Sequence, residues 1–430
     1  MKTIIIFFLP IILLGIVNCD TNEPPPPPDG EKPTLELTLE DASCIEAWIT
    51  LTTTNLQLPA TMTLKQFNPT GDTLSQILNL NTQDSLLYID SLLPKQSYIF
   101  QSSIQPINQS EVKSNELSVT TMDTTSHDFT FETFTFGGNA GSCALYDVAI
   151  INENNIWAVG EINIADTSIN GYTTYNAVHW DGINWELLRI PFLFQGDSFY
   201  NPIYAVFAFN ADDIWFGIGN LIHWDGTRYF PIGISSVFPS LVNKIWGSSS
   251  EDLYAVGNNG NIVHYNGQSW QRIESGTNLN IGDIWGIFNG NDGYNKYLAA
   301  VNTMLIINEY GNLQRVITEQ GHTLSSVWGI SEKLLYTAGG NGLSLYKNNK
   351  WEKINKPDVN TIYNVRGQGH NDVFGLSSTF NLLHFNGYSW QYINIGGSNI
   401  YYRQEVKNEL TVVVGWQGDK AVIIVIRRNQ

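Results

Sequence analysis

The sequence predicts an all-β protein in which a small sandwich precedes a ring of repeated four-stranded sheets. A unit of about forty residues recurs along the second part of the chain, and one copy reads "IWGSSSEDLYAVGNNGNIVHYNGQSW" (245–270). Each copy holds short apolar runs joined by Asn-Gly or Asp-Gly turns, which suit tight hairpins because glycine readily adopts a positive φ. Charged residues make up only 14% of the chain, and 37 residues are glycine. Together these observations predict a β-propeller in which every repeat forms one blade.

The N-terminus carries the signals of an exported protein. Residues 1–18 contain one lysine followed by a long apolar run, and Cys19 comes next. This pattern resembles the signal peptide of bacterial lipoproteins, although Asn18 replaces the small residue that usually precedes the cysteine. We therefore expect cleavage after residue 18 and a lipid on Cys19, which anchors the protein to the outer membrane or cell surface without a spanning segment; ordinary secretion is the alternative. The prolines of the linker over 19–31 favour an extended spacer.

A separate β domain is predicted over residues 32–123. Its short runs alternate apolar and polar residues, as in "LELTLE" (35–40) and "SYIFQSSI" (97–104), which is typical of a β-sandwich. Leu93-Pro94, Tyr98 and Trp48 resemble the corner and core residues of a fibronectin type III domain. The resemblance implies a spacer module, so no site is expected there.

The propeller is predicted over residues 129–430. Its last copy ends after the third strand, whereas a strand-like stretch, "FTFETFTFGG" (129–138), precedes the first copy. We expect this N-terminal strand to complete the last blade and remove an open sheet edge. The second strands of the units indicate seven blades: Ile156-Trp157, Ile214-Trp215, Leu253-Tyr254, Tyr297-Leu298, Leu335-Tyr336, Val373-Phe374 and Leu410-Thr411.

The propeller repeats also resemble those of a known group of proteins. "WGSSSEDLYAVG" (246–257) above all is similar to repeats of exported bacterial lipoproteins that join a fibronectin type III-like domain to a propeller. Some relatives with this layout are labelled glucosyltransferase. This sequence has no Asp-x-Asp pair for a metal-bound sugar nucleotide, and it contains no Gly-x-Ser-x-Gly, phosphate-loop, dinucleotide or His-Glu-x-x-His motif. We therefore do not extend that activity to this chain.

Charge, histidines and cysteines narrow the function classes further. The formal net charge is −18 and no run of Lys or Arg offsets it, which argues against nucleic-acid binding. No metal or cofactor is expected. Cys44 and Cys143 fall in different predicted domains, so two buried thiols are favoured over the alternative of a disulfide. Four histidines share one repeat position, and each is expected to hydrogen-bond a turn of its own blade rather than a metal: His179, His223, His264 and His384.

Candidate ligand residues lie in the first strand of the later blades. Blades 3, 4 and 5 carry an indole after an aliphatic residue, at Trp246, Trp285 and Trp328. Blade 6 carries Arg366 at this position, and blade 7 is expected to carry Arg403. A repeat that departs from its own pattern indicates a candidate site. Either each guanidinium pairs with a neighbouring carboxylate, or the two form a cationic patch near the channel that binds a carboxylate or sulfate of an acidic glycan or peptide.

Two insertions distinguish blade 1 from the repeat. They are "EINIADTSINGYTTYN" (161–176) and "PFLFQGDSFYNP" (191–202). Exposed aromatic residues in such loops either pack locally or meet a partner.

Three function classes remain open. The first is a surface-displayed monomer whose propeller channel binds a glycan, a peptide or a protein. The second is a carbohydrate-active enzyme, a hydrolase or lyase, which calls for two carboxylates at glycosidase spacing in the channel. The third is a structural protein of the cell envelope. An aromatic channel that is poor in carboxylates favours the first class.

Overall fold

The computed structural model describes residues 32–106, 110–194, 196–290, 293–318, 323–347, 350–354, 361–377, 381–396 and 399–429. The predicted signal peptide, Cys19 and the whole linker over 19–31 lie outside these residues. The contacts divide the chain into two compact units: Met1–Asp41, Ala47–Ile89 and Ser97–Val119 form one, and Ala42–Glu46, Asp90–Gln96 and Thr120–Gln430 form the other. Apart from one 3-10 helix, η1 (Asn258–Gly260), the regular elements described are β-strands, so the chain is all-β as predicted. No helix in this part of the chain has the length and apolarity needed to cross a bilayer.

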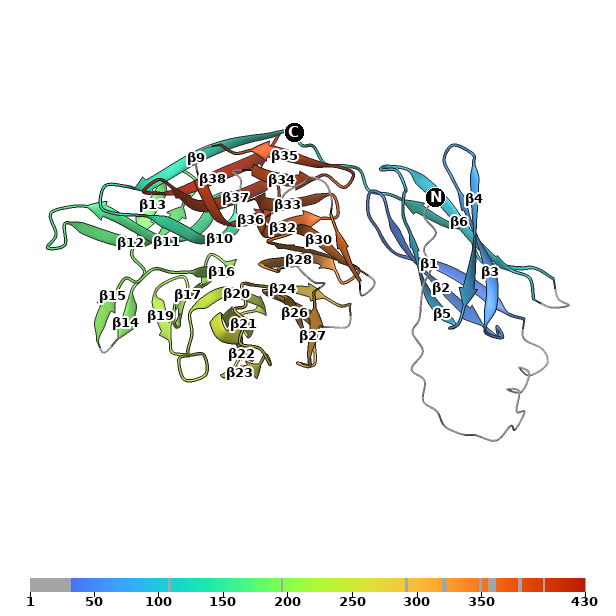
Figure 1. Ribbon diagram of the computed structural model, residues 1–430, viewed down its shortest axis with the longest axis horizontal. Coiled ribbons are helices and arrows are strands. Elements are labelled where there is room, and N and C mark those ends of the chain that lie inside the picture. Colours follow the sequence, from blue (N-terminus) through green and yellow to red (C-terminus); the bar gives the residue numbers. More distant parts are fainter. Residues whose placement is uncertain are drawn as a thin grey trace. The chain divides into compact units, whose positions relative to one another are not determined.

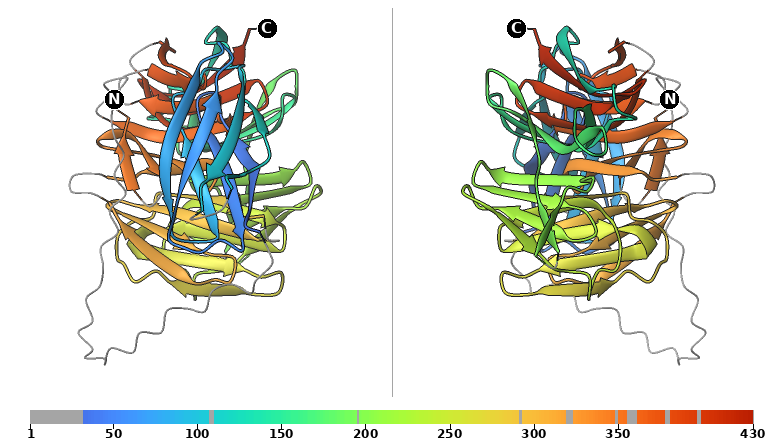
Figure 2. Two further views of the ribbon diagram at one scale, coloured as in Figure 1. Left: turned by 90° about the vertical axis from the view of Figure 1, so that its right-hand side faces the viewer. Right: turned by 90° about the vertical axis from the view of Figure 1, so that its left-hand side faces the viewer.

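The first unit contains two β-sheets with a core of their own. Figure 2 shows its strands, in blue to teal, running side by side. Leu37, Trp48 and Phe100 are each at most 1% exposed, because alternate residues of a strand point to the same face. The resemblance to a fibronectin type III domain stays a prediction. In sheet order the strands are β1 (Thr34–Ala42), β2 (Ala47–Thr54) and β5 (Asp84–Ile89), then β4 (Thr73–Leu80), β3 (Ala60–Phe67), β6 (Ser97–Ile104) and β7 (Val112–Lys113), with β8 (Leu117–Thr120) also paired to β6.

The second unit contains, within the described residues, seven four-stranded antiparallel sheets. Six of them follow the chain in simple order, and each is one predicted blade. Their strands are β10 (Ala144–Asn152), β11 (Asn155–Ala165), β12 (Tyr172–Trp180) and β13 (Trp185–Leu188); β16 (Ala205–Asn210), β17 (Asp213–Gly217), β18 (Leu221–Trp224) and β19 (Tyr229–Ile232); β20 (Val242–Ser249), β21 (Asp252–Gly257), β22 (Asn261–Tyr265) and β23 (Trp270–Glu274); β24 (Asp283–Phe288), β25 (Tyr294–Ala300), β26 (Thr303–Ile307) and β27 (Leu313–Ile317); β28 (Ser326–Ser331), β29 (Leu334–Gly339), β30 (Gly342–Lys347) and β31 (Lys350–Lys353); and β32 (Ile362–Gly369), β33 (Asp372–Ser377), β34 (Asn381–Phe385) and β35 (Trp390–Asn394).

The seventh sheet combines the two ends of the propeller sequence. Its order is β36 (Asn399–Lys407), β37 (Leu410–Gln417), β38 (Lys420–Arg428) and then β9 (Phe129–Gly137). Strands β38 and β9 pair antiparallel along their full length, and Figure 1 shows β9, in teal, beside the red β38. The N-terminal strand expected from the sequence is thus the outer strand of the last blade.

The first strand of every blade lies beside a common centre. Figure 1 shows β10, β16, β20, β24, β28, β32 and β36 around this centre. Neighbouring first strands contact one another, and β10 contacts β36 as well as β16, so the ring is closed. Apolar clusters fill the interfaces between blades; in one of them Leu145 and Val148 pack with Val412 and Ile423. The unit is therefore a seven-bladed β-propeller.

The tight turns between third and fourth strands have the predicted chemistry. An Asp or Asn oxygen accepts backbone N–H groups two and three residues further on, as Asp181 does from Ile183 and Asn184. The glycine of each turn has a φ between 81° and 95°, a region that side chains disfavour. These glycines are Gly182, Gly226, Gly267 and Gly387.

The repeated histidine fixes the turn between the first and second strands. In each case Nε2 lies 2.7–3.0 Å from a carboxylate or amide oxygen at the start of the second strand. The imidazole also stacks on the aromatic ring of that strand. The expected structural role is therefore confirmed for the four pairs His179–Asn155, His223–Asp213, His264–Asp252 and His384–Asp372.

The cysteines and the potential metal ligands are also placed by the structure. Cys44 and Cys143 are buried free thiols, which is the alternative that the sequence favours. Among the described residues, no group of three or more His, Cys, Asp or Glu side chains is arranged to hold a metal ion.

The two insertions of blade 1 form hairpins on one side of the propeller. Strands β11 and β12 extend beyond the neighbouring strands to make one hairpin, and β14 (Phe192–Phe194) with β15 (Asp197–Phe199) makes the other. Both hairpins lie at the end where first strands begin, because an antiparallel meander returns to that side after its second and fourth strands. Arg189 ties them together, since its Nε donates to the Thr174 carbonyl at 3.1 Å and its guanidinium lies 3.6 Å from the centre of the Tyr200 ring.

Candidate functional site

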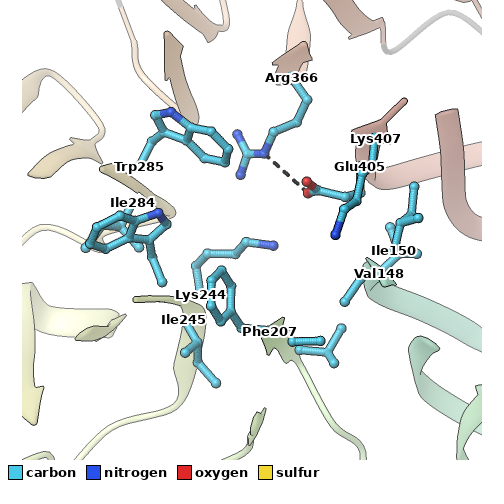
Figure 3. Close-up of a pocket in the computed structure, with 14 residues that line it drawn as sticks. Val148, Ile150, Phe207, Lys244, Ile245, Ile284, Trp285, Arg366, Glu405 and Lys407 are labelled. Carbon is cyan, nitrogen blue, oxygen red and sulfur yellow. Dashed lines mark ion pairs between the residues drawn. The ribbon is translucent and has the colours of Figure 1, made fainter. Parts of the chain in front are cut away.

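A cavity of about 210 Å³ lies at the centre of the propeller. Its wall comes from the first strands of six blades and is mostly apolar, with Phe207, Trp246 and Trp285 as its aromatic residues. Four charged side chains also line it, and Figure 3 shows them: Lys244, Arg366, Glu405 and Lys407.

The strand registers show which residues of the seven first strands are equivalent. Arg403 pairs with Val414 of β37. Val406 instead pairs with the residue of β37 that stands where most other second strands have an aromatic residue. The expected equivalence of Arg403 and Arg366 is therefore wrong, because β36 continues to Lys407 before its turn. The equivalent residues, in blade order, are Ala149, Phe207, Trp246, Trp285, Trp328, Arg366 and Val406.

The three indoles predicted for the site do not all reach the cavity. Trp246 and Trp285 line it, although Trp246 is only 6% exposed. Trp328 is 1% exposed and packs between blades against Tyr336 and Val365. Two of the three indoles therefore belong to the cavity wall, and Trp328 belongs to the core.

Arg366 is one half of a buried ion pair. This is the first of its two predicted roles, in which the guanidinium pairs with a neighbouring carboxylate. Its Nη2 and Nη1 donate to the carboxylate oxygens of Asp283 at 2.7 and 2.9 Å, and the two side chains are 1% and 0% exposed. Burial alone opposes ionisation of Asp283, but the Arg366 guanidinium outweighs it and lowers the pKa of that carboxyl to about 2. The carboxylate of Asp283 thus neutralises the positive charge of Arg366.

A second buried ion pair was missed by sequence reasoning. Lys244 Nζ lies 2.7 and 2.9 Å from the two carboxylate oxygens of Asp147, which also accepts the N–H of Val206 at 3.0 Å. Lys244, Asp147 and Asp283 occupy equivalent positions of their first strands. These positions come two residues before the one that Arg366 occupies in its own strand. A charged residue inside an otherwise apolar first strand, as in "VNKIWG" (242–247), is the signal that indicates such a pair.

Glu405 and the remaining guanidinium nitrogen of Arg366, Nε, face each other on the cavity wall. Glu405 Oε2 lies 3.7 Å from Arg366 Nε, beyond hydrogen-bond distance, and its side chain is 23% exposed. Figure 3 shows the two groups pointing toward each other. Burial raises the pKa of Glu405, although Arg366 and Lys244 act in the opposite direction. Among the described residues, Glu405 is the one carboxylate on the cavity wall, since Asp147 and Asp283 lie behind it in their ion pairs.

Arg403 crosses the ring at one end of the cavity. Its Nη2 donates to the Gly282 carbonyl at 2.6 Å, which links β36 of blade 7 to the chain just before β24 of blade 4. On the same side, Tyr146 stacks on Tyr204 with ring centres 5.1 Å apart, and Tyr402 lies 5.6 Å from Tyr146. Arg366 and Arg403 thus use separate acceptors, and the structure does not combine them into one cationic patch.

Comparison with known proteins supports the fold. No family profile matches the chain, and no curated protein matches its sequence. The solved structure of YCF48 from Cyanidioschyzon merolae is 14% identical, with 69% of this chain and 98% of that chain covered and a TM-score of 0.53. YCF48 bound to D1 peptide is 15% identical, with 71% and 98% covered and a TM-score of 0.51. U3-55K is 10% identical, with 71% and 99% covered and a TM-score of 0.50. At these identities the likeness shows that the chain has a β-propeller fold.

Proposed function

We propose that this propeller is a binding module whose ligand enters the central cavity. One observation carries the proposal: the cavity wall combines aromatic side chains with charged groups that two buried ion pairs hold in place. A site that is already fixed before binding loses less conformational entropy when its ligand arrives. The structure of YCF48 with a D1 peptide adds support, because it is a propeller of the same fold in complex with a ligand.

The proposed module acts outside the cell. Cleavage after residue 18 and lipidation of Cys19 anchor the chain, and the linker together with a fibronectin type III-like spacer holds the propeller away from the membrane surface. The N-terminal sequence supports this arrangement, and Cys19 itself lies outside the described residues. In the anchored form the propeller meets glycans or proteins outside the cell.

A carbohydrate-active enzyme is the weaker candidate. Glycosidases act through two carboxyl groups that flank the scissile bond, at separations of about 5–10 Å. The described part of the cavity wall offers Glu405 alone. Asp147 and Asp283 are each held by both oxygens in a buried pair, so neither is available to a substrate.

Ala149→Phe tests the proposed site. Ala149 lines the cavity at the level where blades 2 to 5 carry an aromatic residue, so a phenyl ring there fills the cavity without breaking the repeat pattern. The secreted Cys19→Ser protein is first screened against glycan and peptide libraries. We expect Ala149→Phe to abolish binding of the hits with little change in Tm, and Ala165→Phe, at an exposed hairpin position of the same blade, to leave binding intact. Unchanged binding in Ala149→Phe contradicts a role for the cavity.

A further inference from the structure

We infer that the cavity binds a neutral sugar ring at the end of a glycan, with one of its hydroxyls bridging Arg366 and Glu405. This inference rests on the proposed function and adds the chemical class of the ligand. It starts from two polar groups that the fold leaves facing each other.

The first step concerns the hydrogen bonds of Arg366. The two terminal nitrogens are occupied, because they donate to Asp283 and Nη1 also reaches Ser326 and backbone carbonyls. The Nε–H has no hydrogen-bond partner in the described structure, although the side chain is 1% exposed. A buried donor without an acceptor is costly, so a small movement of the side chains around Nε that admits a ligand or water oxygen is favoured at this point.

The second step concerns what lies on the other side. Glu405 Oε2 is 3.7 Å from Arg366 Nε. This separation is beyond hydrogen-bond distance, and a single oxygen placed beside the line between the two atoms can contact both. A hydroxyl meets both requirements with a single atom, since it accepts from the Nε–H and donates its own proton to the carboxylate.

The third step is the charge of the wall, which disfavours an ionic ligand. Asp283 neutralises Arg366, and Asp147 neutralises Lys244. The remaining charges are Glu405 and Lys407, one of each sign. A ligand carboxylate pairs with Lys407 but meets Glu405, and a ligand ammonium pairs with Glu405 but meets Lys407. A neutral group that both donates and accepts avoids both conflicts.

The fourth step is the shape of the cavity. At about 210 Å³ it is smaller than the pockets of roughly 300–1,000 Å³ that enclose drug-sized ligands, so it suits one ring and not a longer segment. Phe207 and Trp285, which are only partly buried, supply aromatic surface for the C–H face of a pyranose. The Arg403–Gly282 hydrogen bond crosses the ring at one end and would have to break before a polymer could thread through. The geometry therefore favours a terminal sugar residue.

The test uses ligands that differ only in charge and class. Methyl glycosides of neutral hexoses, the matching uronic acids, and capped peptides with asparagine, lysine or aspartate are titrated into the Cys19→Ser protein by calorimetry or NMR. We expect a neutral hexoside to bind, with an affinity nearly independent of salt. Glu405→Gln should weaken it by about tenfold, because a charge-assisted hydrogen bond becomes a neutral one. Glu153→Gln, an exposed carboxylate in the first turn of blade 1, is the matched control and should change nothing.

The other outcomes separate this inference from the proposed function. If Ala149→Phe abolishes binding but the ligand is a uronic acid whose affinity rises in Glu405→Gln, the cavity is the site and the neutral sugar is wrong. If a peptide binds and Ala149→Phe abolishes its binding, the cavity is again the site and the neutral sugar is again wrong. If binding of every hit survives Ala149→Phe, the proposed site itself is wrong. Arg366 is left unchanged throughout, because its ion pair with Asp283 supports the fold.

Discussion

Asp283→Asn removes the counter-ion of a buried guanidinium and keeps the size of the side chain. In the native protein the Asp283 carboxylate accepts two hydrogen bonds from Arg366, one from Ser326 Oγ at 2.5 Å and one from the Val327 N–H at 3.2 Å. Asparagine retains one oxygen but presents an amide N–H₂ group to its neighbours. Arg366, at 1% exposure, then loses its bidentate partner, and the carboxylate that remains beside it is Glu405, 3.7 Å from its Nε.

The expected loss of stability follows from two estimates. Breaking a buried ion pair by removing one partner costs about 3–5 kcal/mol. The lowering of the Asp283 pKa from 3.8 to about 2 corresponds to about 2 kcal/mol, a net figure that already contains the cost of burial. Over the roughly 300 residues of the propeller, with an unfolding entropy of about 2.1 cal/mol/K per residue, a loss of 3–5 kcal/mol lowers Tm by about 5–8 °C.

Differential scanning calorimetry of the wild type, Asp283→Asn and Asp225→Asn checks this expectation. Asp225 also has a pKa near 2, but local hydrogen bonds in an exposed turn produce it, so its replacement should shift Tm by less than 2 °C. The stabilisation from Asp283 should be present above pH 4 and should fade as the pH falls toward 2, because its folded pKa is the lower one. If Asp283→Asn melts like Asp225→Asn at neutral pH, the buried pair does not support the fold as argued.

Three further predictions concern other parts of the chain. Deleting 129–137 removes β9 and exposes the edge of β38, so the propeller should lose far more Tm than after deletion of 32–119; a propeller that starts at residue 140 and melts like the full one contradicts closure by β9. Shortening the hairpin over 161–176 should leave the far-ultraviolet circular dichroism and the cooperative melt intact, whereas collapse of the whole domain would show that the hairpin belongs to the core. Cys19→Ser should move the protein from the membrane fraction to the soluble fraction, and an unchanged partition on immunoblots argues against lipidation.

Features that repeat locally were predictable from the sequence. The hairpin glycines, the turn-bonding histidines and the missing strand of the last blade follow from patterns that recur within about forty residues. Each depends on contacts inside one blade, or on counting the strands. The resemblance of residues 32–123 to a fibronectin type III domain and the lipid on Cys19 remain predictions.

The chemistry of the centre was less predictable, because it depends on residues of different blades. Arg366 and Asp283 are 83 positions apart, and no local pattern indicates that they form a pair. Arg403 was misplaced because the level of a residue depends on where its strand turns, and β36 turns after Lys407. Glu405 gave no signal, since one acidic residue near a turn is common. Lys244 shows that a charged residue in an apolar first strand indicates a central ion pair as clearly as a departure from the repeat does.

The pairing of β9 with β38 determines when the protein can finish folding. Among the propeller strands, a ribosome produces β9 first and β38 last, and at about 5–20 residues per second the interval is roughly 15–60 s. Blades 1 to 6 are contiguous meanders, so their local contacts can form during this interval, whereas the ring stays open and β9 has no strand to pair with. Closure is therefore a late, long-range step that requires β38. A circular permutant that begins at Ala144 and joins Arg428 to residues 129–137 through a short turn makes the same contact local, and it should close as soon as its last strand is released.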